Sequence, residues 1–201
     1  MAVWNWRKMR RLIDRCSVLL LGFVVVAFGL SLMFRSTLGM GAWGAFQIGL
    51  AQISGLSVGR ATQIVSLGTL LLAWLLGVRP TMASFLNMVT IGLVMDMFLE
   101  RIPVVNDLFL QILLFGAGLL CFTLGIAIYL KAELGSGPRE SLMLGIHEKF
   151  DISIRSSRIA MDGTMLVISI LLRGPVGVGT VVHTFGCGPL IQFFMTFLST
   201  Y

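Results

Sequence analysis

Residues 22–49 (GFVVVAFGLSLMFRSTLGMGAWGAFQIG) and residues 118–145 (GLLCFTLGIAIYLKAELGSGPRESLMLG) are two versions of one segment, displaced by 96 positions. Every glycine of the second segment has a glycine at the matching position of the first. The match continues downstream, where Asn87 corresponds to His183. Glycine is common in membrane helices, but the coincidence of all five in one ungapped window indicates an internal duplication. The paired glycines are Gly22/Gly118, Gly29/Gly125, Gly39/Gly135, Gly41/Gly137 and Gly49/Gly145.

The composition around these segments is that of a chain surrounded by lipid. The 201 residues are 57% apolar and 12% charged, with a mean hydropathy of +0.94, whereas a soluble domain is about half apolar and about a quarter charged. A helix needs about 20 apolar residues to cross a bilayer, and the chain has six apolar runs near that length, the fifth being short. The predicted spans are residues 16–34, 61–78, 82–99, 108–130, 159–172 and 176–200.

The positive charges predict the orientation of these spans. With the N-terminus inside, the cytoplasmic segments carry eleven of the 15 Lys and Arg residues and the outside segments carry four. Positive charge accumulates on cytoplasmic loops, so we expect a multi-pass membrane protein with both termini cytoplasmic. The net charge of +6 therefore reports topology, and we expect no nucleic-acid partner.

Each copy of the repeat contains three spans, an odd number, so the second copy must enter the membrane with the opposite orientation. We therefore expect an all-α polytopic membrane protein with six transmembrane helices in two inverted three-helix repeats. A short helix, re-entrant or interfacial, follows the first span of each repeat. The expected parts are a basic cytoplasmic N-terminus (1–15), repeat 1 (16–99), an outside linker (100–107) and repeat 2 (108–201). Many secondary transporters have this architecture and bind solutes at the midplane where the repeats meet.

The short helix of the second copy begins with an anion-binding pattern. Gly135-Ser-Gly137 is a flexible turn, Pro138 suits the first helical position, and Arg139-Glu140 follow. A helix N-terminus presents free N–H groups and a positive dipole end, to which Arg139 would add a full charge. Alternatively, Arg139 serves membrane topology and Glu140 favours the helix start.

Polar residues within the apolar runs are the other candidates, because charged groups in hydrocarbon are costly and normally face an interior or a cavity. Asp96 lies deep in the third run, whereas Asp162 is expected to pair with Arg158 one helical turn earlier. The candidate solute-binding residues are Gly39, Gly41, Trp43, Asn87, Gly135, Gly137, Arg139 and His183. The candidates for coupling a proton or ion are Asp96, Glu140 and His183.

These features predict a small transporter or channel-like protein for a small anionic or zwitterionic solute. The alternative is a non-transporting regulatory or accessory membrane protein, or the substrate-binding subunit of a larger complex. The three isolated cysteines and the lack of metal-ligand spacing, catalytic triad or phosphate loop predict no enzyme, no metal and no cofactor. Besides the bilayer and the solute, the expected partners are a second copy of the chain, since glycine-rich helix faces favour association, and a further membrane protein.

The chain resembles the YczE branch of the YczE/YyaS/YitT family of bacterial integral membrane proteins over nearly its whole length. The matching stretches are Leu38-Gly-x-Gly-x-Trp43, Gly55-Leu-Ser-Val-Gly59, Leu86-Asn87…Gly92-Leu-Val-x-Asp96, Leu134-Gly-Ser-Gly-Pro-Arg139, Gly177-Val-Gly-Thr180 and Gly188-Pro189. The resemblance implies the same fold class and a location in a bacterial cytoplasmic (inner) membrane, but no substrate. Ala42 and Gly44 stand where the family has Pro and Asp, Arg139-Glu140 where it has Arg-Asp, and Ala83-Ser84 where it has Gly-Thr, so an acid follows in one copy only.

Overall fold

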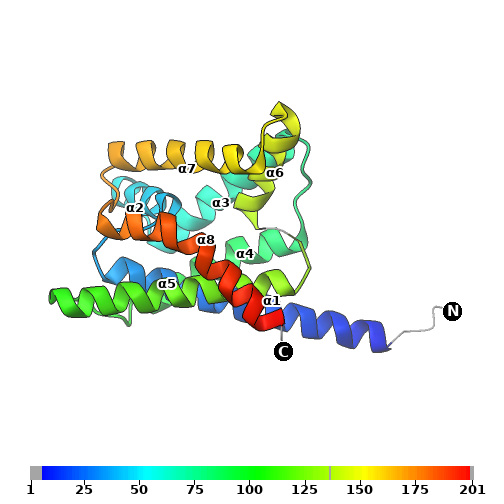
Figure 1. The fold of residues 1–201 in the computed structure, drawn as a ribbon, viewed down its shortest axis with the longest axis horizontal. Coiled ribbons are helices and arrows are strands. Elements are labelled where there is room, and N and C mark those ends of the chain that lie inside the picture. Colours follow the sequence, from blue (N-terminus) through cyan, green and yellow to red (C-terminus); the bar gives the residue numbers. More distant parts are fainter. Residues whose placement is uncertain (1–5, 136, 200–201) are drawn as a thin grey trace.

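The computed structural model describes residues 6–135 and 137–199, with side chains from residue 12 onward. The regular secondary structure of this part of the chain consists of helices alone, joined by turns and loops (Figure 1). Both ends of the chain lie outside the described residues, namely residues 1–5 of the predicted N-terminal segment and residues 200–201 of predicted repeat 2. So does Ser136 of the predicted turn Gly135-Ser-Gly137. The helices are α1 (Trp6–Arg35), α2 (Ala42–Ser54), α3 (Val58–Leu75), α4 (Met82–Leu99), α5 (Leu108–Lys131), α6 (Pro138–Phe150), α7 (Ile154–Leu171) and α8 (Val178–Ser199).

Five of these helices, α1, α3, α4, α5 and α8, are long and apolar enough to cross a membrane, and they coincide with five of the six predicted spans. The predicted fifth span corresponds to α7, which begins at Ile154 instead of residue 159. It is not among the helices that meet the criterion for a span. The reason is that the helix includes Arg155, Arg158 and Asp162, so a sixth crossing remains a prediction.

The helix bounds repeat at the same offset of 96 residues as the sequence. Helices α2 and α6 are both 13 residues long and begin 96 positions apart, and α3 and α7 are both 18 residues long with the same offset. The backbone repeats as well, because the described residues with positive φ form four pairs at this offset. These pairs are Thr37/Glu133, Gly39/Gly135, Gly55/Asp151 and Gly77/Arg173. Since positive φ is uncommon for residues other than glycine, three of the pairs preserve a rare conformation although the residue type differs.

Glycines bring α1 and α5 into close contact along the middle of the protein. A Cβ atom at Gly22 would lie 2.9 Å from the carbonyl oxygen of Gly125, and one at Gly29 would lie 2.6 Å from that of Gly118. Residues later in α1 therefore contact residues earlier in α5, so the two helices run antiparallel. Small residues at such positions let membrane helices pack backbone against backbone.

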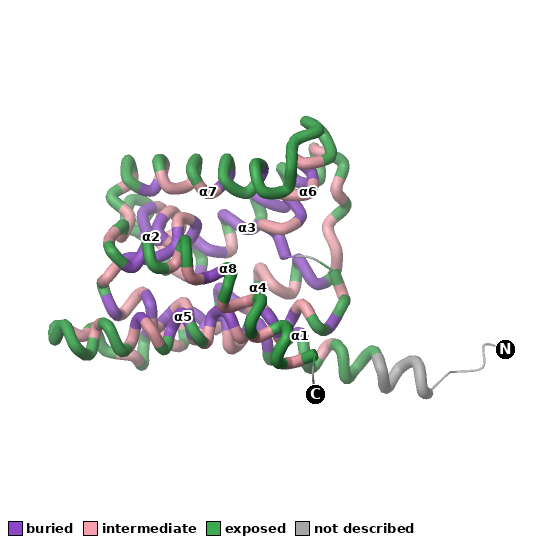
Figure 2. Tube along the Cα trace, in the orientation of Figure 1, coloured by how far each residue is buried: buried purple, intermediate pink, exposed green. Residues whose placement is uncertain are grey.

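Burial is uneven over the molecule (Figure 2). Helix α2 buries one face through Trp43, Ala45, Ile48, Gly49 and Ala51, so protein covers this short helix, as membrane depth would require. Helices α7 and α8 are exposed over much of their length, and only 11% of the most apolar window of α8 is buried. This exposed surface belongs to the second half of the chain.

Candidate functional site

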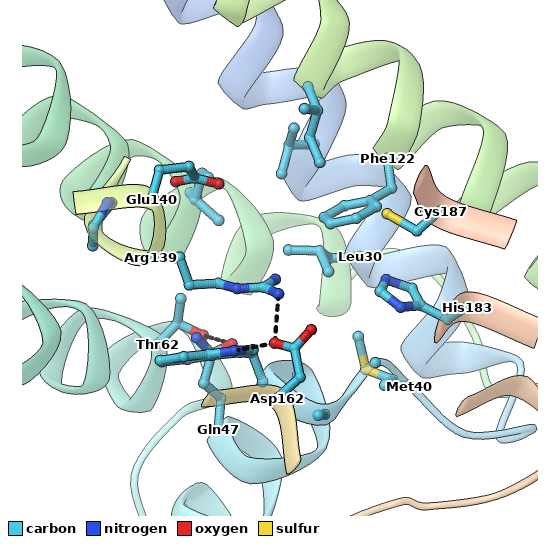
Figure 3. Close-up of a pocket in the computed structure, with 18 of the residues that line it drawn as sticks. Leu30, Met40, Gln47, Thr62, Phe122, Arg139, Glu140, Asp162, His183 and Cys187 are labelled. Carbon is cyan, nitrogen blue, oxygen red and sulfur yellow. Dashed lines mark hydrogen bonds and ion pairs between the residues drawn. The ribbon is translucent and has the colours of Figure 1, made fainter. Parts of the chain in front are cut away.

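A cavity of about 250 Å³ lies between the helices and is lined by residues from all eight of them. Its walls are mixed, because apolar residues such as Leu30 and Phe122 alternate with hydroxyl, amide and charged groups. Figure 3 shows Arg139 and Asp162 joined across its middle, with His183 on the far side of Asp162. The charged residues that line the cavity are Arg139, Glu140, Arg158 and Asp162.

The first turns of the two short helices, α2 and α6, open onto this cavity. In each case a Leu-Gly-x-Gly turn precedes the helix, and its first glycine has a positive φ, +111° at Gly39 and +122° at Gly135. The N-cap residues Gly41 and Gly137 provide no side-chain hydrogen bond to the helix. Because the first N–H groups of a helix have no partner within it, both helices present hydrogen-bond donors and a positive dipole end near the cavity.

Asp162 of α7 is the centre of the polar network. Arg139 and the indole Nε1 of Trp43 both donate hydrogen bonds to its Oδ1 atom, each over 2.9 Å. The guanidinium of Arg139 also lies 5.3 Å from the centroid of the Trp43 ring, within the range of a cation–π contact. Arg158 approaches the other oxygen, Oδ2, only to 3.7 Å. Trp43 and Arg139 occupy the same position in the two short helices, 96 residues apart, so the two halves meet at this carboxylate.

Asn87 and His183, the other matched pair, each approach the short helix of the opposite half. A Cβ atom at Gly41 would overlap the ring of His183, which also lies 5.4 Å from the ring of Phe122. Asn87 lies beside Gly137, since its Nδ2 atom would be 3.7 Å from a Cβ atom there. The last helix of each half therefore contributes one polar side chain beside the first turn of the other half's short helix.

The structure brings six of the predicted site residues to the cavity: Gly41, Trp43, Asn87, Arg139, Glu140 and His183. The predicted glycines Gly39, Gly135 and Gly137 do not line it. Gly39 lies against Gly177 and Thr180, and Gly135 lies against Thr81. Gly137 is the N-cap of α6 and lies next to the carboxylate of Glu140. These three glycines belong to the turns that orient the short helices α2 and α6.

Asp96 was predicted together with Glu140 and His183 to couple a proton or ion, but unlike them it does not line this cavity, which corrects its assignment to the same site. Its carboxylate accepts hydrogen bonds from the Ser57 hydroxyl at 2.6 Å and from the Gly59 backbone N–H at 2.7 Å. A carboxylate at a helix N-terminus compensates the free N–H groups and the dipole, so Asp96 of α4 stabilises the beginning of α3.

The expectation for Asp162 was incomplete, because its principal contacts are with Arg139 and Trp43 and not with Arg158. The repeat does contain a sequence pattern that could have indicated that Asp162 faces the cavity. Positions 96 residues before Arg158 and Asp162 are Thr62 and Ser66, and all four residues line the cavity. Polar residues at matched positions of α3 and α7 thus identify the facing sides of these helices. Among the described residues, no group of three or more His, Cys, Asp or Glu side chains could hold a metal ion.

The cavity is enclosed differently by the two halves. Helices α3 and α4 pack along each other, whereas the corresponding α7 and α8 do not. A Cβ atom at Gly92 of α4 would lie 2.7 Å from the Gly59 carbonyl oxygen, but its counterpart Gly188 of α8 has no neighbour within 4 Å. Gly188 borders the cavity, together with Arg158 and Asp162 of α7. The seam between the last two helices is therefore closed in the first half and separated in the second.

Comparison with known proteins confirms the family resemblance noted in the sequence. Residues 13–196 match a family of unknown function, DUF6198. The uncharacterized membrane protein YczE of Bacillus subtilis (strain 168) is 33% identical over 193 residues, covering 92% of this chain and 86% of the relative. The uncharacterized protein YyaS of the same organism is 30% identical, covering 87% of this chain and 89% of the relative. A protein of Haemophilus influenzae is 29% identical, covering 91% and 84%. No solved structure matches.

Proposed function

The chain belongs to DUF6198, a family of unknown function, and we propose that it is a membrane transporter or channel-like protein for a small anionic or zwitterionic solute. Because the function of the family is unknown, the activity has to be inferred from the cavity of this chain. The observation that carries this proposal is the Arg139–Asp162 pair in a cavity between two helix N-termini. Arg139 and the uncapped first turn of α2 would bind the anionic group of the solute. The cavity volume lies below the roughly 300–1,000 Å³ of sites for drug-sized ligands, so the solute is small.

We further propose that the two halves are inverted repeats and that α7 is the sixth span. The offset of 96 residues in helix bounds and in positive-φ positions supports the duplication. The antiparallel contact of α1 with α5, which are the first helices of the two halves, supports the inversion. Inverted repeats of this kind bind solutes at the interface of the repeats in many secondary transporters. The distribution of the positive charges supports a topology with both termini in the cytoplasm, and we propose a bacterial inner membrane as the location.

The unequal seams suggest how the cavity would change its access. In inverted-repeat transporters, rocking of one repeat against the other opens the site alternately to each side. Here the seam at Gly59 and Gly92 is closed, while the corresponding surface at Gly188 is open. A second state would have the reverse arrangement, with α7 packed on α8 and α3 separated from α4. Asp96 would release the N–H of Gly59 in that state, which gives it a role in the seam instead of the predicted coupling of a proton or ion in the cavity.

Water access to the cavity tests this proposal against the accessory alternative. In a variant whose three cysteines are replaced by alanine, Ser66→Cys places a thiol on the cavity wall. We expect a charged, water-soluble thiol reagent to label it in reconstituted vesicles, since the reactive thiolate forms only where water reaches it. Leu71→Cys, on the exposed apolar surface of the same helix, is the control and should stay unlabelled in lipid. An unlabelled Ser66→Cys would mean a dry interior and would favour the accessory role.

A further inference from the structure

The charges of the cavity point to a narrower class of solute, and this inference rests on the proposed function. The charged residues lining the cavity are two of each sign, Arg139 and Arg158 against Glu140 and Asp162. Arg139 is already paired with Asp162 at 2.9 Å. A simple anion bound to Arg139 would therefore add a negative charge beside Asp162, and a simple cation bound to Asp162 would add a positive charge beside Arg139.

The Arg139–Asp162 pair is still accessible from the cavity. About 30% of the surface of each side chain is still exposed, and both side chains line the cavity. On Asp162, Oδ1 accepts both short hydrogen bonds, whereas within the described part of the chain Oδ2 has only Arg158, at 3.7 Å. A carboxylate oxygen has two acceptor positions, so Oδ2 has room for a donor from a solute. A guanidinium has five N–H donors, and Arg139 uses one of them on Asp162.

We propose that the site selects zwitterions of amino-acid size, with the ammonium of the solute on Oδ2 of Asp162 and its carboxylate on the guanidinium of Arg139. A solute with both charges forms an ion pair with Asp162 and another with Arg139, and it leaves the net charge of the cavity unchanged. A solute with one charge pays for the desolvation of that charge and leaves the cavity with a net charge. Trp43 holds Asp162 in place through Oδ1, which keeps Oδ2 directed away from Arg139 (Figure 3).

The test uses four probes of matched shape on the purified, detergent-solubilised protein. Alanine and β-alanine are zwitterions, propionate is either molecule without its amine, and ethylamine is either molecule without its carboxylate. A ligand that binds only the folded state raises the thermal midpoint. We expect one or both zwitterions to raise the midpoint of the wild-type protein, and propionate and ethylamine to leave it unchanged at the same concentration.

Asp162→Asn is the decisive variant because it removes the ammonium partner and releases Arg139. We expect zwitterion affinity to fall about tenfold or more, as for loss of one partner of a desolvated charge pair, and a propionate-dependent stabilisation to appear. Asp107→Asn is the matched control. Asp107 is an exposed N-cap of α5, and Asn caps a helix as well as Asp does, so this variant should respond to the probes as the wild-type protein does.

If Asp162→Asn does not fold, the double variant Arg139→Gln/Asp162→Asn removes both charges together and should respond to none of the probes. The inference is overturned if propionate stabilises the wild-type protein as strongly as the zwitterions do, or if a variant lacking Asp162 keeps the preference for zwitterions. It also fails if Ser66→Cys is labelled by the thiol reagent but no zwitterion stabilises the protein. In that case the proposed transport function survives, whereas an unlabelled Ser66→Cys contradicts the transport function itself.

Discussion

Gly118→Ala should destabilise the protein, while Gly116→Ala, two residues earlier on the same helix, should not. A Cβ atom at Gly118 would lie 2.8 Å from the Gly29 carbonyl oxygen and 2.9 Å from the Met33 backbone nitrogen, both on α1. Ordinary contacts begin near 3.4 Å, so α1 and α5 must separate by about 0.6 Å, and overpacking of this kind costs about 1–3 kcal/mol. Gly116 has no neighbour within 4 Å, so alanine there should gain about 0.5–1 kcal/mol from its better helix propensity.

Thermal unfolding of the two variants in the same detergent measures the difference. For a chain of this size, 1 kcal/mol changes the midpoint by about 2–4 °C. We therefore expect Gly118→Ala to lower the midpoint by roughly 2–12 °C and Gly116→Ala to leave it unchanged or slightly raised. Equal midpoints for the two variants would refute the direct backbone contact between α1 and α5. The antiparallel arrangement of the two halves would then lose its main support.

Three further changes test other parts of the structure. Asp96→Asn should destabilise by about 1–3 kcal/mol through weaker hydrogen bonds to α3, seen as a lower midpoint; an unchanged midpoint would speak against the cap. Gly41→Ala should destabilise by about 1–3 kcal/mol because its methyl group overlaps the His183 ring, and His183→Ala should restore much of that loss if this overlap is the cause. Arg173→Gly should stabilise by about 0.5–1 kcal/mol in denaturant or thermal unfolding, since Arg173 has a φ of +56°; a lower stability would show that the arginine side chain matters there.

Much of the fold could be predicted because its determinants are local. Apolar runs of sufficient length identify membrane helices whatever their neighbours, and five of the predicted spans agree with the structure to within a few residues, apart from the N-terminal extension of α1. The Leu-Gly-x-Gly turns were recognisable because Gly39 and Gly135 adopt a backbone conformation that glycine accepts easily. The short helices followed, since Pro138 stands at the start of α6.

The range of α7 was harder to predict because its charged residues obscure the helix. Arg155, Arg158 and Asp162 lower the local hydropathy, so the sequence places the start of this segment several residues too late. Two of these charges line the cavity, and Asp162 has a partner in α6 and another in α2. A hydropathy pattern carries no information on such partners, since they lie 23 and 119 residues away along the chain.

The partners of Asp96 and Asp162 are determined by the tertiary structure and could not be predicted from the sequence. Each is an acid in one of the apolar runs that the sequence predicts as spans, and the sequence favoured Asp96 as the functional one. The packing of α3 against α4 turns Asp96 toward the start of α3, while the meeting of α2, α6 and α7 brings Asp162 to Trp43 and Arg139. The sequence alone determined the duplication, the helices and the turns, because these depend on residues close together in the chain. Which charges share the cavity was decided by the packing of the two halves, because a charge in a poorly solvated interior is stable only beside partners that the fold supplies.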